Sequence, residues 1–240
     1  FYGVAASSAD RITSTVYDER NLYMDSVVRI YVFHGTTLKY GTGFFINGNR
    51  IVTCAHVIAP DGVNCLDRVW IEFVYFINGK LQTSRRVYCP VIAFDGANDI
   101  AVLEGDKWTT ARGTPLPIDS EYTPEIGETL FFKGFPKEAW EEQDVVFTGM
   151  TDVMVRQNDG TYKYYSDTVS FRGLIYGGAS GGPVLNADGS IIGINMSTCN
   201  GTGMAYAINA GRLQALLDSL DSKSANDAEL DGAIPAEQAA

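Results

Sequence analysis

The sequence has no run of about 18 or more apolar residues, so no membrane-spanning helix is predicted. It contains only two histidines and no Cys-x-x-Cys pair, so the spacing does not suggest a metal site. The chain begins at Phe1, without a methionine and without a basic segment followed by an apolar stretch, so no signal peptide is predicted. We therefore expect a processed product, a trimmed form or a piece of a longer polypeptide.

Positive charge is also scarce. The chain has 18 Lys and Arg against 29 Asp and Glu, which gives a net charge of −11. This balance argues against nucleic acid or an anionic membrane as the main partner. Acidic residues are frequent from Asp218 to the end, where Lys223 is the single base. Such a composition is typical of a solvated extension, and we expect a disordered acidic tail at 221–240.

Short runs rich in Val, Ile, Phe and Tyr recur along the rest of the chain. Roughly six predicted strands lie on each side of a Pro-containing stretch, which is typical of an all-β sandwich or a pair of barrels. The predicted strands are 27–33, 42–46, 50–54, 69–76, 87–94, 100–103, 129–133, 144–155, 162–169, 182–185, 191–195 and 204–208. One helix is predicted near the end, because Leu213, Leu216, Leu217 and Leu220 form an apolar stripe after Asn209, a suitable N-cap.

One serine, Ser180, stands among glycines in the run 177–183 (GGASGGP). A serine hydroxyl is a weak nucleophile at neutral pH and needs a general base, which in turn needs a carboxylate that fixes its tautomer. Two upstream motifs supply candidates: His56 in VTCAHV and Asp99 in NDIAVL. The order His, Asp, Ser is one of the orders in which this triad occurs, and it indicates the two-barrel chymotrypsin arrangement.

Each candidate has an alternative interpretation. A short Gly-x-Ser-Gly could be an ordinary turn, but the longer run that leads into an apolar strand is more specific. His34, the other histidine, is interpreted as a turn residue. Asp95 competes with Asp99, but Asp95 is followed by glycine, as in common turns, whereas Asp99 directly precedes a predicted strand. The amides of Gly178 and Ser180 are predicted to form an oxyanion hole, because glycine adopts the required backbone conformation without penalty.

With these motifs, the chain resembles the trypsin-like serine proteases of the chymotrypsin fold, most closely the protease domain of the HtrA/Deg family. The similarity covers residues 38–217, and besides the three motifs it includes GTGFFI at 41–46, GFP at 134–136, GIN at 193–195 and MAYAI at 204–208. The resemblance implies an all-β fold of two antiparallel six-stranded β-barrels with a C-terminal helix. It also implies a serine endopeptidase that acts on protein or peptide substrates and needs no metal or organic cofactor.

The predicted strands and the composition divide the chain into parts, and the resemblance implies where substrate binds. The expected parts are an N-terminal arm (1–25), a first barrel (26–113), a linker (114–123), a second barrel with the helix (124–220) and the acidic tail (221–240). The walls of the substrate pocket are expected at Leu174, Ile175, Asn195, Thr198 and Gly203. No acidic residue lies in these segments, so we expect cleavage after small or medium apolar side chains, not after Lys or Arg.

The chain departs from the secreted members of the fold at two positions. Ala179 stands where secreted trypsins carry an aspartate that pairs with a freed N-terminus, so Phe1 is not expected to trigger activation. Val57 stands where secreted relatives usually carry a cysteine, and we expect free thiols in a reducing compartment for Cys54, Cys65, Cys89 and Cys199. Two alternative functions stay open: a self-processing protease of polyprotein or viral origin, and a catalytically silent binding module of the same fold.

Overall fold

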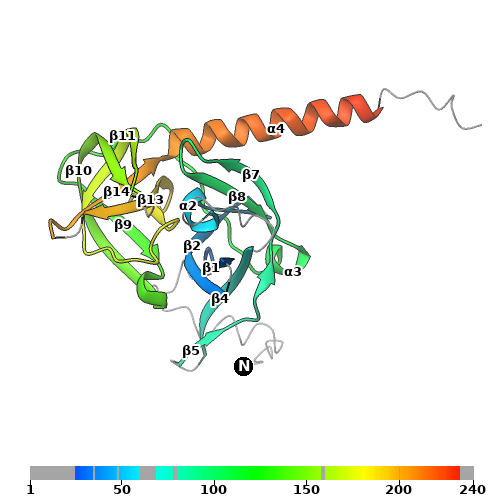
Figure 1. The fold of residues 1–240 in the computed structure, drawn as a ribbon, viewed down its shortest axis with the longest axis horizontal. Helices are drawn as coiled ribbons and strands as arrows, with labels where there is room; N and C mark the ends of the chain where they lie inside the picture. The colour runs from blue at the N-terminus through cyan, green and yellow to red at the C-terminus, as the bar shows by residue number, and fades with distance from the viewer. Residues whose placement is uncertain are drawn as a thin grey trace, which may run out of the picture.

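The computed structural model of the protein describes residues 25–34, 36–47, 49–59, 69–77, 80–157, 160–199 and 201–232. These residues form two antiparallel β-sheets that lie side by side, with one long helix running past both (Figure 1). Of the expected N-terminal arm, only Asp25 lies within the described residues. None of the helices in the described ranges has the length and apolar character needed to cross a membrane.

The first sheet occupies the N-terminal half of the chain. Its hydrogen-bonded order is β5-β4-β1-β2-β3-β8-β7, and β6 also pairs with β4. Two helical turns, α2 (Ala55–Ile58) and α3 (Lys107–Thr110), were not predicted from the sequence. The strands are β1 (Val27–His34), β2 (Thr37–Asn47), β3 (Arg50–Cys54), β4 (Val69–Ile77), β5 (Lys80–Thr83), β6 (Val87–Tyr88), β7 (Val91–Asp95) and β8 (Ile100–Glu104).

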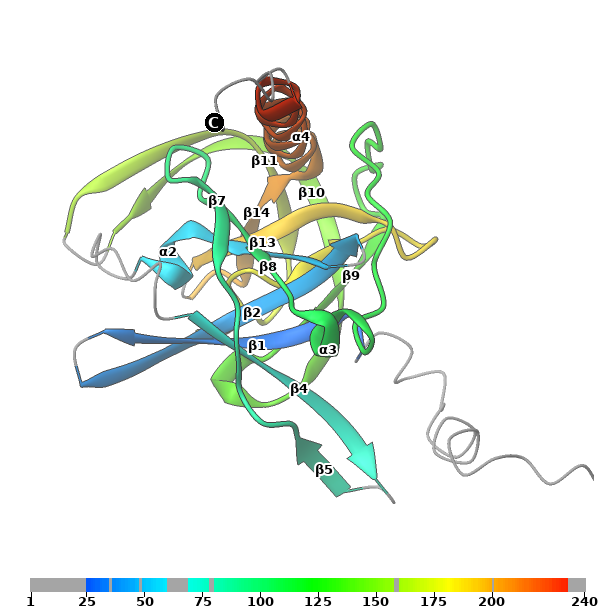
Figure 2. The same ribbon diagram turned by 90° about the vertical axis from the view of Figure 1, so that its right-hand side faces the viewer.

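A bent strand brings the two ends of this sheet together. The strand predicted at 87–94 is interrupted at Pro90, which has no N–H to donate to a neighbour. Its first half, β6, pairs with β4, and its second half, β7, pairs with β8. The amide of Cys89 still donates to Val69 O at 3.0 Å, and Glu104 N donates to Pro90 O at 2.9 Å. The first barrel is therefore closed around its core, while β5 extends β4 into a hairpin outside the ring (Figure 2).

The second sheet is a closed barrel in the order β10-β11-β14-β13-β12-β9. A short 3-10 turn, η3 (Pro136–Glu138), follows β9. Large apolar side chains such as Phe132, Phe147 and Phe171 fill its interior, and each such burial contributes roughly 1.5–3 kcal/mol. The strands are β9 (Thr129–Gly134), β10 (Glu141–Arg156), β11 (Tyr162–Arg172), β12 (Pro183–Leu185), β13 (Ile191–Cys199) and β14 (Met204–Asn209).

The helix α4 (Ala210–Gly232) closes the fold and is longer than predicted. Asn209 caps it, because Asn209 Oδ1 accepts a hydrogen bond from Arg212 N at 3.2 Å. Leu213 and Leu217 of the helix are buried. The expected tail at 221–240 is thus helical as far as Gly232. Asp221 binds the guanidinium of Arg50 on β3, which fixes this part of the helix to the first barrel. Residues 233–240 lie outside the described ranges.

Candidate active site

His56 lies in α2, the single helical turn that follows β3. Asp99 fixes this turn, since Ala55 N donates to Asp99 O at 3.0 Å and His56 N donates to Asp99 Oδ1 at 2.8 Å. The other carboxylate oxygen, Oδ2, lies 2.7 Å from His56 Nδ1. This contact places the ring proton on Nδ1, so the lone pair of Nε2 can act as a base.

Asp99 is held in an unusual backbone conformation just before β8. It is 3% exposed, and its φ of +61° lies in the left-handed region, which Asp tolerates better than most residues. Asp95 shapes the turn that leads to it, accepting bonds from Asn98 N at 2.9 Å and from Asn98 Nδ2 at 2.6 Å. Burial would raise the pKa of the Asp95 carboxyl, but the bonds from Asn98 outweigh burial and hold that pKa below its usual value. The carboxylate that contacts His56 is thus that of Asp99.

The pKa of His56 is raised above its usual value. Burial by itself would lower this pKa, and the ammonium of Lys163 lowers it slightly further. The charge of Asp99 and its hydrogen bond outweigh both effects, because they stabilise the imidazolium. The His56 side chain is still 38% exposed, so the ring is accessible to a substrate.

Ser180 lies at the corner of two consecutive turns. Ala179 N donates to Tyr176 O at 3.2 Å, and Gly182 N donates to Ala179 O at 3.0 Å. The third residue of each turn is a glycine with positive φ, +96° at Gly178 and +87° at Gly181, as a type II turn requires. A Cβ at Gly181 would lie 2.1 Å from Thr42 O, so only glycine fits at this position.

Thr42 on β2 joins this turn to the first barrel. Its backbone N donates to Ser180 O at 2.8 Å, and its Oγ1 donates to Gly178 O at 2.8 Å. The same Oγ1 accepts a bond from Phe135 N at 3.0 Å. In the sequence, the only local signal for Thr42 is its place in the Gly-Thr-Gly motif at 41–43.

Cys54 makes a second link between the barrels. Its buried thiol donates to Asn195 O at 3.3 Å, and the same carbonyl accepts Gly181 N at 2.8 Å. The ligand atoms of Cys54, His56 and Asp99 lie within 4.8 Å of one another, the one cluster of metal-ligating type in the described part of the chain. Burial, and then the charge of Asp99, raise the pKa of the Cys54 thiol well above its usual value. Because Cys54 Sγ donates to Asn195 O and His56 Nδ1 contacts Asp99 Oδ2, we interpret this cluster as a hydrogen-bond network.

The hydroxyl of Ser180 is oriented toward the backbone of β13. Its Oγ donates to Met196 O at 3.2 Å, and within the described residues no hydrogen bond joins it to His56. The backbone amides of Gly178 and Ser180 have no acceptor among the described residues either, so both can donate to a ligand. A serine side chain changes between staggered rotamers about one bond, so Oγ can reach other partners by rotation.

The residues expected to line a substrate pocket differ in exposure. Leu174 is 64% exposed, whereas Ile175 packs in the core of the second barrel. Asn195 is buried, and its side-chain Oδ1 has no hydrogen-bond partner among the described residues. Thr198 is half-buried near the end of β13, and Gly203, with φ of +68°, accepts Gly173 N at 2.9 Å through its carbonyl.

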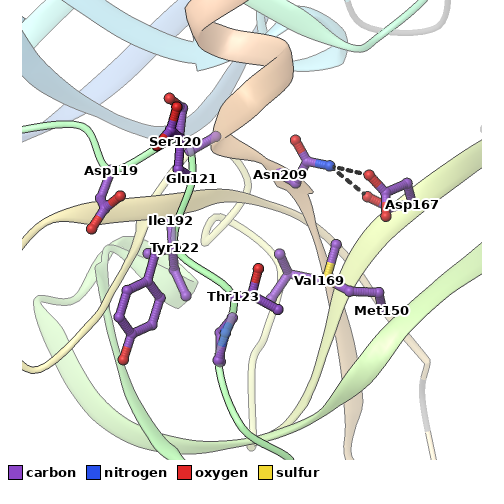
Figure 3. Close-up of a pocket in the computed structure, with 12 residues that line it drawn as sticks. Asp119, Ser120, Glu121, Tyr122, Thr123, Met150, Asp167, Val169, Ile192 and Asn209 are labelled. Carbon is purple, nitrogen blue, oxygen red and sulfur yellow. Dashed lines mark hydrogen bonds between the residues drawn. The ribbon is translucent and has the colours of Figure 1, made fainter.

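A cavity of about 180 Å³ lies at a different place, where the linker meets the start of α4 (Figure 3). Its walls combine the acids Asp119, Glu121 and Asp167 with apolar side chains such as Val169 and Ile192. None of the predicted site residues lines it.

The described cysteines are free thiols. Cys54, Cys89 and Cys199 form no disulfide, and Cys65, for which a free thiol was also expected, lies outside the described ranges. Burial raises the pKa of Cys89 to about 12, so this thiol is unreactive at neutral pH.

The chain is similar in sequence to known peptidases and proteases. The trypsin-like peptidase domain family matches residues 41–194. Relatives include a mitochondrial Do-like protease, number 12, of Arabidopsis thaliana (31% identical over 157 residues, 64% of this chain and 28% of the relative). Another is serine protease HTRA4 of Homo sapiens (27% identical over 202 residues, 80% of this chain and 38% of the relative). The chain thus spans less than half of the length of these relatives.

Solved structures share the fold. The active form of the Rv3671c protease from M. tuberculosis superposes with a TM-score of 0.68 at 20% identity, covering 91% of this chain and 89% of that chain. Together with the relatives, this likeness confirms the resemblance that the sequence motifs predicted.

Proposed function

The chain belongs to the family of trypsin-like peptidase domains, and on this basis we propose that it is a serine endopeptidase with a His56–Asp99–Ser180 triad. The observation that carries the proposal is the His56–Asp99 pair, joined at 2.7 Å. The position of this pair beside the serine is supported by two hydrogen bonds to Asn195 O. One comes from Cys54 Sγ, on the strand before His56, and the other from Gly181 N, the residue after Ser180.

In the proposed reaction, Ser180 Oγ first leaves Met196 O and rotates toward His56. It then attacks the scissile carbonyl carbon while its proton passes to His56 Nε2. The imidazolium, oriented and stabilised by Asp99, gives this proton to the leaving amine, and the acyl group remains on Ser180. A water molecule deprotonated by His56 finally releases the acyl group and restores the serine.

The amides of Gly178 and Ser180 would hold the oxyanion of the tetrahedral intermediate. Neither amide has an acceptor among the described residues, which supports this part, and loss of one such donor typically costs ~10²–10³ in kcat. For specificity we propose small or medium apolar residues on the acyl side of the cleaved bond. The support is that the expected wall segments contain no carboxylate that could pair with Lys or Arg.

The direct test is Ser180→Ala, measured by cleavage of unfolded casein and of a peptide library. We expect kcat to fall by ~10⁶, as for other triad nucleophiles. Ser222→Ala is the matched control, because this exposed hydroxyl donates to Asp218 O within α4. Casein cleavage by Ser180→Ala at the wild-type rate would show that the mechanism is wrong. Absence of cleavage by the wild-type chain would favour the silent binding module.

A further inference from the structure

The turn that presents Asp99 is held from outside the first barrel. Arg212 Nη1 donates to Asn98 Oδ1, and Lys163 Nζ donates to Gly96 O. Arg212 belongs to α4 and Lys163 to β11, so both donors come from elements that follow or build the second barrel. Figure 2 shows the β10–β11 hairpin and α4 on the side of the first barrel where β7 ends.

Arg212 is itself fixed by a bulge in the second barrel. Its Nη2 donates to Ser166 O at 2.9 Å and to Ser166 Oγ at 2.8 Å. Ser166 lies where the β10–β11 register shifts, between the pairs Val153↔Tyr165 and Thr151↔Thr168. Such bulges commonly re-aim groups next to active sites.

The bulge has its own supports. Asp167, the residue after Ser166, has a φ of +52°. Its amide donates to Asp152 Oδ1 at 2.9 Å, and its Oδ2 accepts Asn209 Nδ2 at 2.6 Å, a contact drawn in Figure 3. Asn209 also caps α4 through Arg212 N. The bulge, the helix start and the Arg212 side chain therefore form one connected unit.

Asn98 links Arg212 to Asp99. It binds Asp95 through both its amide groups and directly precedes Asp99. A left-handed φ at a residue other than glycine persists only where the surrounding structure holds it. Arg212, by fixing Asn98, supplies such a constraint at the point where the chain enters the strained residue.

We propose that Arg212 is a positioning residue that sets the place of the Asp99 carboxylate relative to His56. The inference rests on the proposed function, because that function gives Asp99 its part in the triad. Both carboxylate oxygens bind His56, at 2.8 Å to its amide and 2.7 Å to its ring, so small movements of the turn break these bonds. A misplacement of ~1 Å in such a site can cost ~10² in rate.

The first test is Arg212→Met, which removes the guanidinium and keeps the aliphatic stem. We expect kcat to fall by roughly 10- to 100-fold, with KM within about twofold, because substrate contacts are unchanged. Asp221→Asn is the matched control: it breaks a different contact between α4 and the first barrel, the ion pair with Arg50, which lies away from the Asp99 turn. This control should keep kcat within about twofold of wild type.

The pH profile separates positioning from simple loss of a charge. If the Asp99 carboxylate moves away, the pKa of His56 falls, and the acidic limb of kcat/KM moves to lower pH. If Arg212 acted only as a nearby cation, its removal would raise that pKa and move the limb to higher pH. The other titratable groups at the pair, Cys54, Tyr165 and Lys163, are the same in both proteins. A shift to higher pH, or no shift, would overturn the proposal.

A double-mutant cycle with Asn98→Ala tests the route. If Arg212 acts through Asn98, the double variant loses no more kcat than the larger single effect, whereas additive losses would refute this route. Circular dichroism and thermal melts check folding, and Asn98→Ala carries the same kinetic test if Arg212→Met does not fold. If neither wild type nor Asp221→Asn shows cleavage that depends on Ser180, the proposed function is refuted. Full kcat in Arg212→Met, with active wild type, would refute only this inference.

Discussion

Thr42→Val isolates the junction between the first barrel and the serine turn. Valine has nearly the shape of threonine, so the change removes only the hydroxyl of a fully buried residue. It leaves two partners without a bond: Gly178 O, 2.8 Å from Thr42 Oγ1, and Phe135 N, 3.0 Å from it. The backbone bond from Thr42 N to Ser180 O is retained.

The expected magnitude follows from these two groups. A buried polar group left without a partner costs ~1–3 kcal/mol, so the free energy of unfolding should fall by about 2 kcal/mol or more. The Gly178 peptide also loses the bond that fixes its orientation. If its amide then no longer points at the oxyanion, kcat falls by up to ~10².

Urea denaturation and steady-state hydrolysis of a peptide measure the two effects. Thr42→Ser is the control, because it keeps the hydroxyl and loses only a methyl group. We expect Thr42→Ser to lie close to wild type in kcat. If Thr42→Val and Thr42→Ser have the same kcat and the same free energy of unfolding, the hydroxyl does not organise the turn, and the reasoning is refuted.

Four further predictions concern the active site and the cysteines. Asp99→Asn should lower kcat by ~10⁴ and move the acidic limb of kcat/KM to lower pH, since Asp99 raises the pKa of His56. The raised pKa of His56 also contributes to the free energy of unfolding. This contribution is fully present below the unfolded pKa of about 6.5 and is lost as pH rises through the folded pKa. Denaturation of wild type and of His56→Gln at several pH values measures it. Gly181→Ala should abolish activity and lower the melting temperature, because its φ is +87° and its Cβ would meet Thr42 O at 2.1 Å. A thiol reagent followed by peptide mapping should label exposed Cys199 in the native protein before the buried Cys54 and Cys89.

Much of the fold follows from local patterns. The alternation of apolar residues located β9 and β13 near 129–133 and 191–195, and the leucine stripe located α4. The break at Pro90 was also visible in principle, because a proline inside a predicted strand removes a donor. The extension of α4 to Gly232 has no such local signal, because an acidic composition favours a tail, and the pair between Asp221 and Arg50 joins residues far apart in the chain.

The finer geometry of the site has no local signature. Thr42 meets Gly178 across 136 positions, and Asn98 meets Arg212 across 114. No periodicity or motif encodes such contacts, since they depend on how the two barrels dock. The rotamer of Ser180 likewise depends on Met196 O, which belongs to β13. Motif spacing could therefore nominate His56, Asp99 and Ser180 but not the residues that hold them in place.

Labelling with a fluorophosphonate probe, mapped by mass spectrometry, tests most directly whether distant parts of the chain combine to activate one hydroxyl. We expect a covalent adduct on Ser180 in the wild-type chain and loss of that adduct in His56→Gln, which removes the base. If Ser180 of the folded wild-type chain is not labelled, or if wild type and His56→Gln are labelled equally, the proposed triad is wrong.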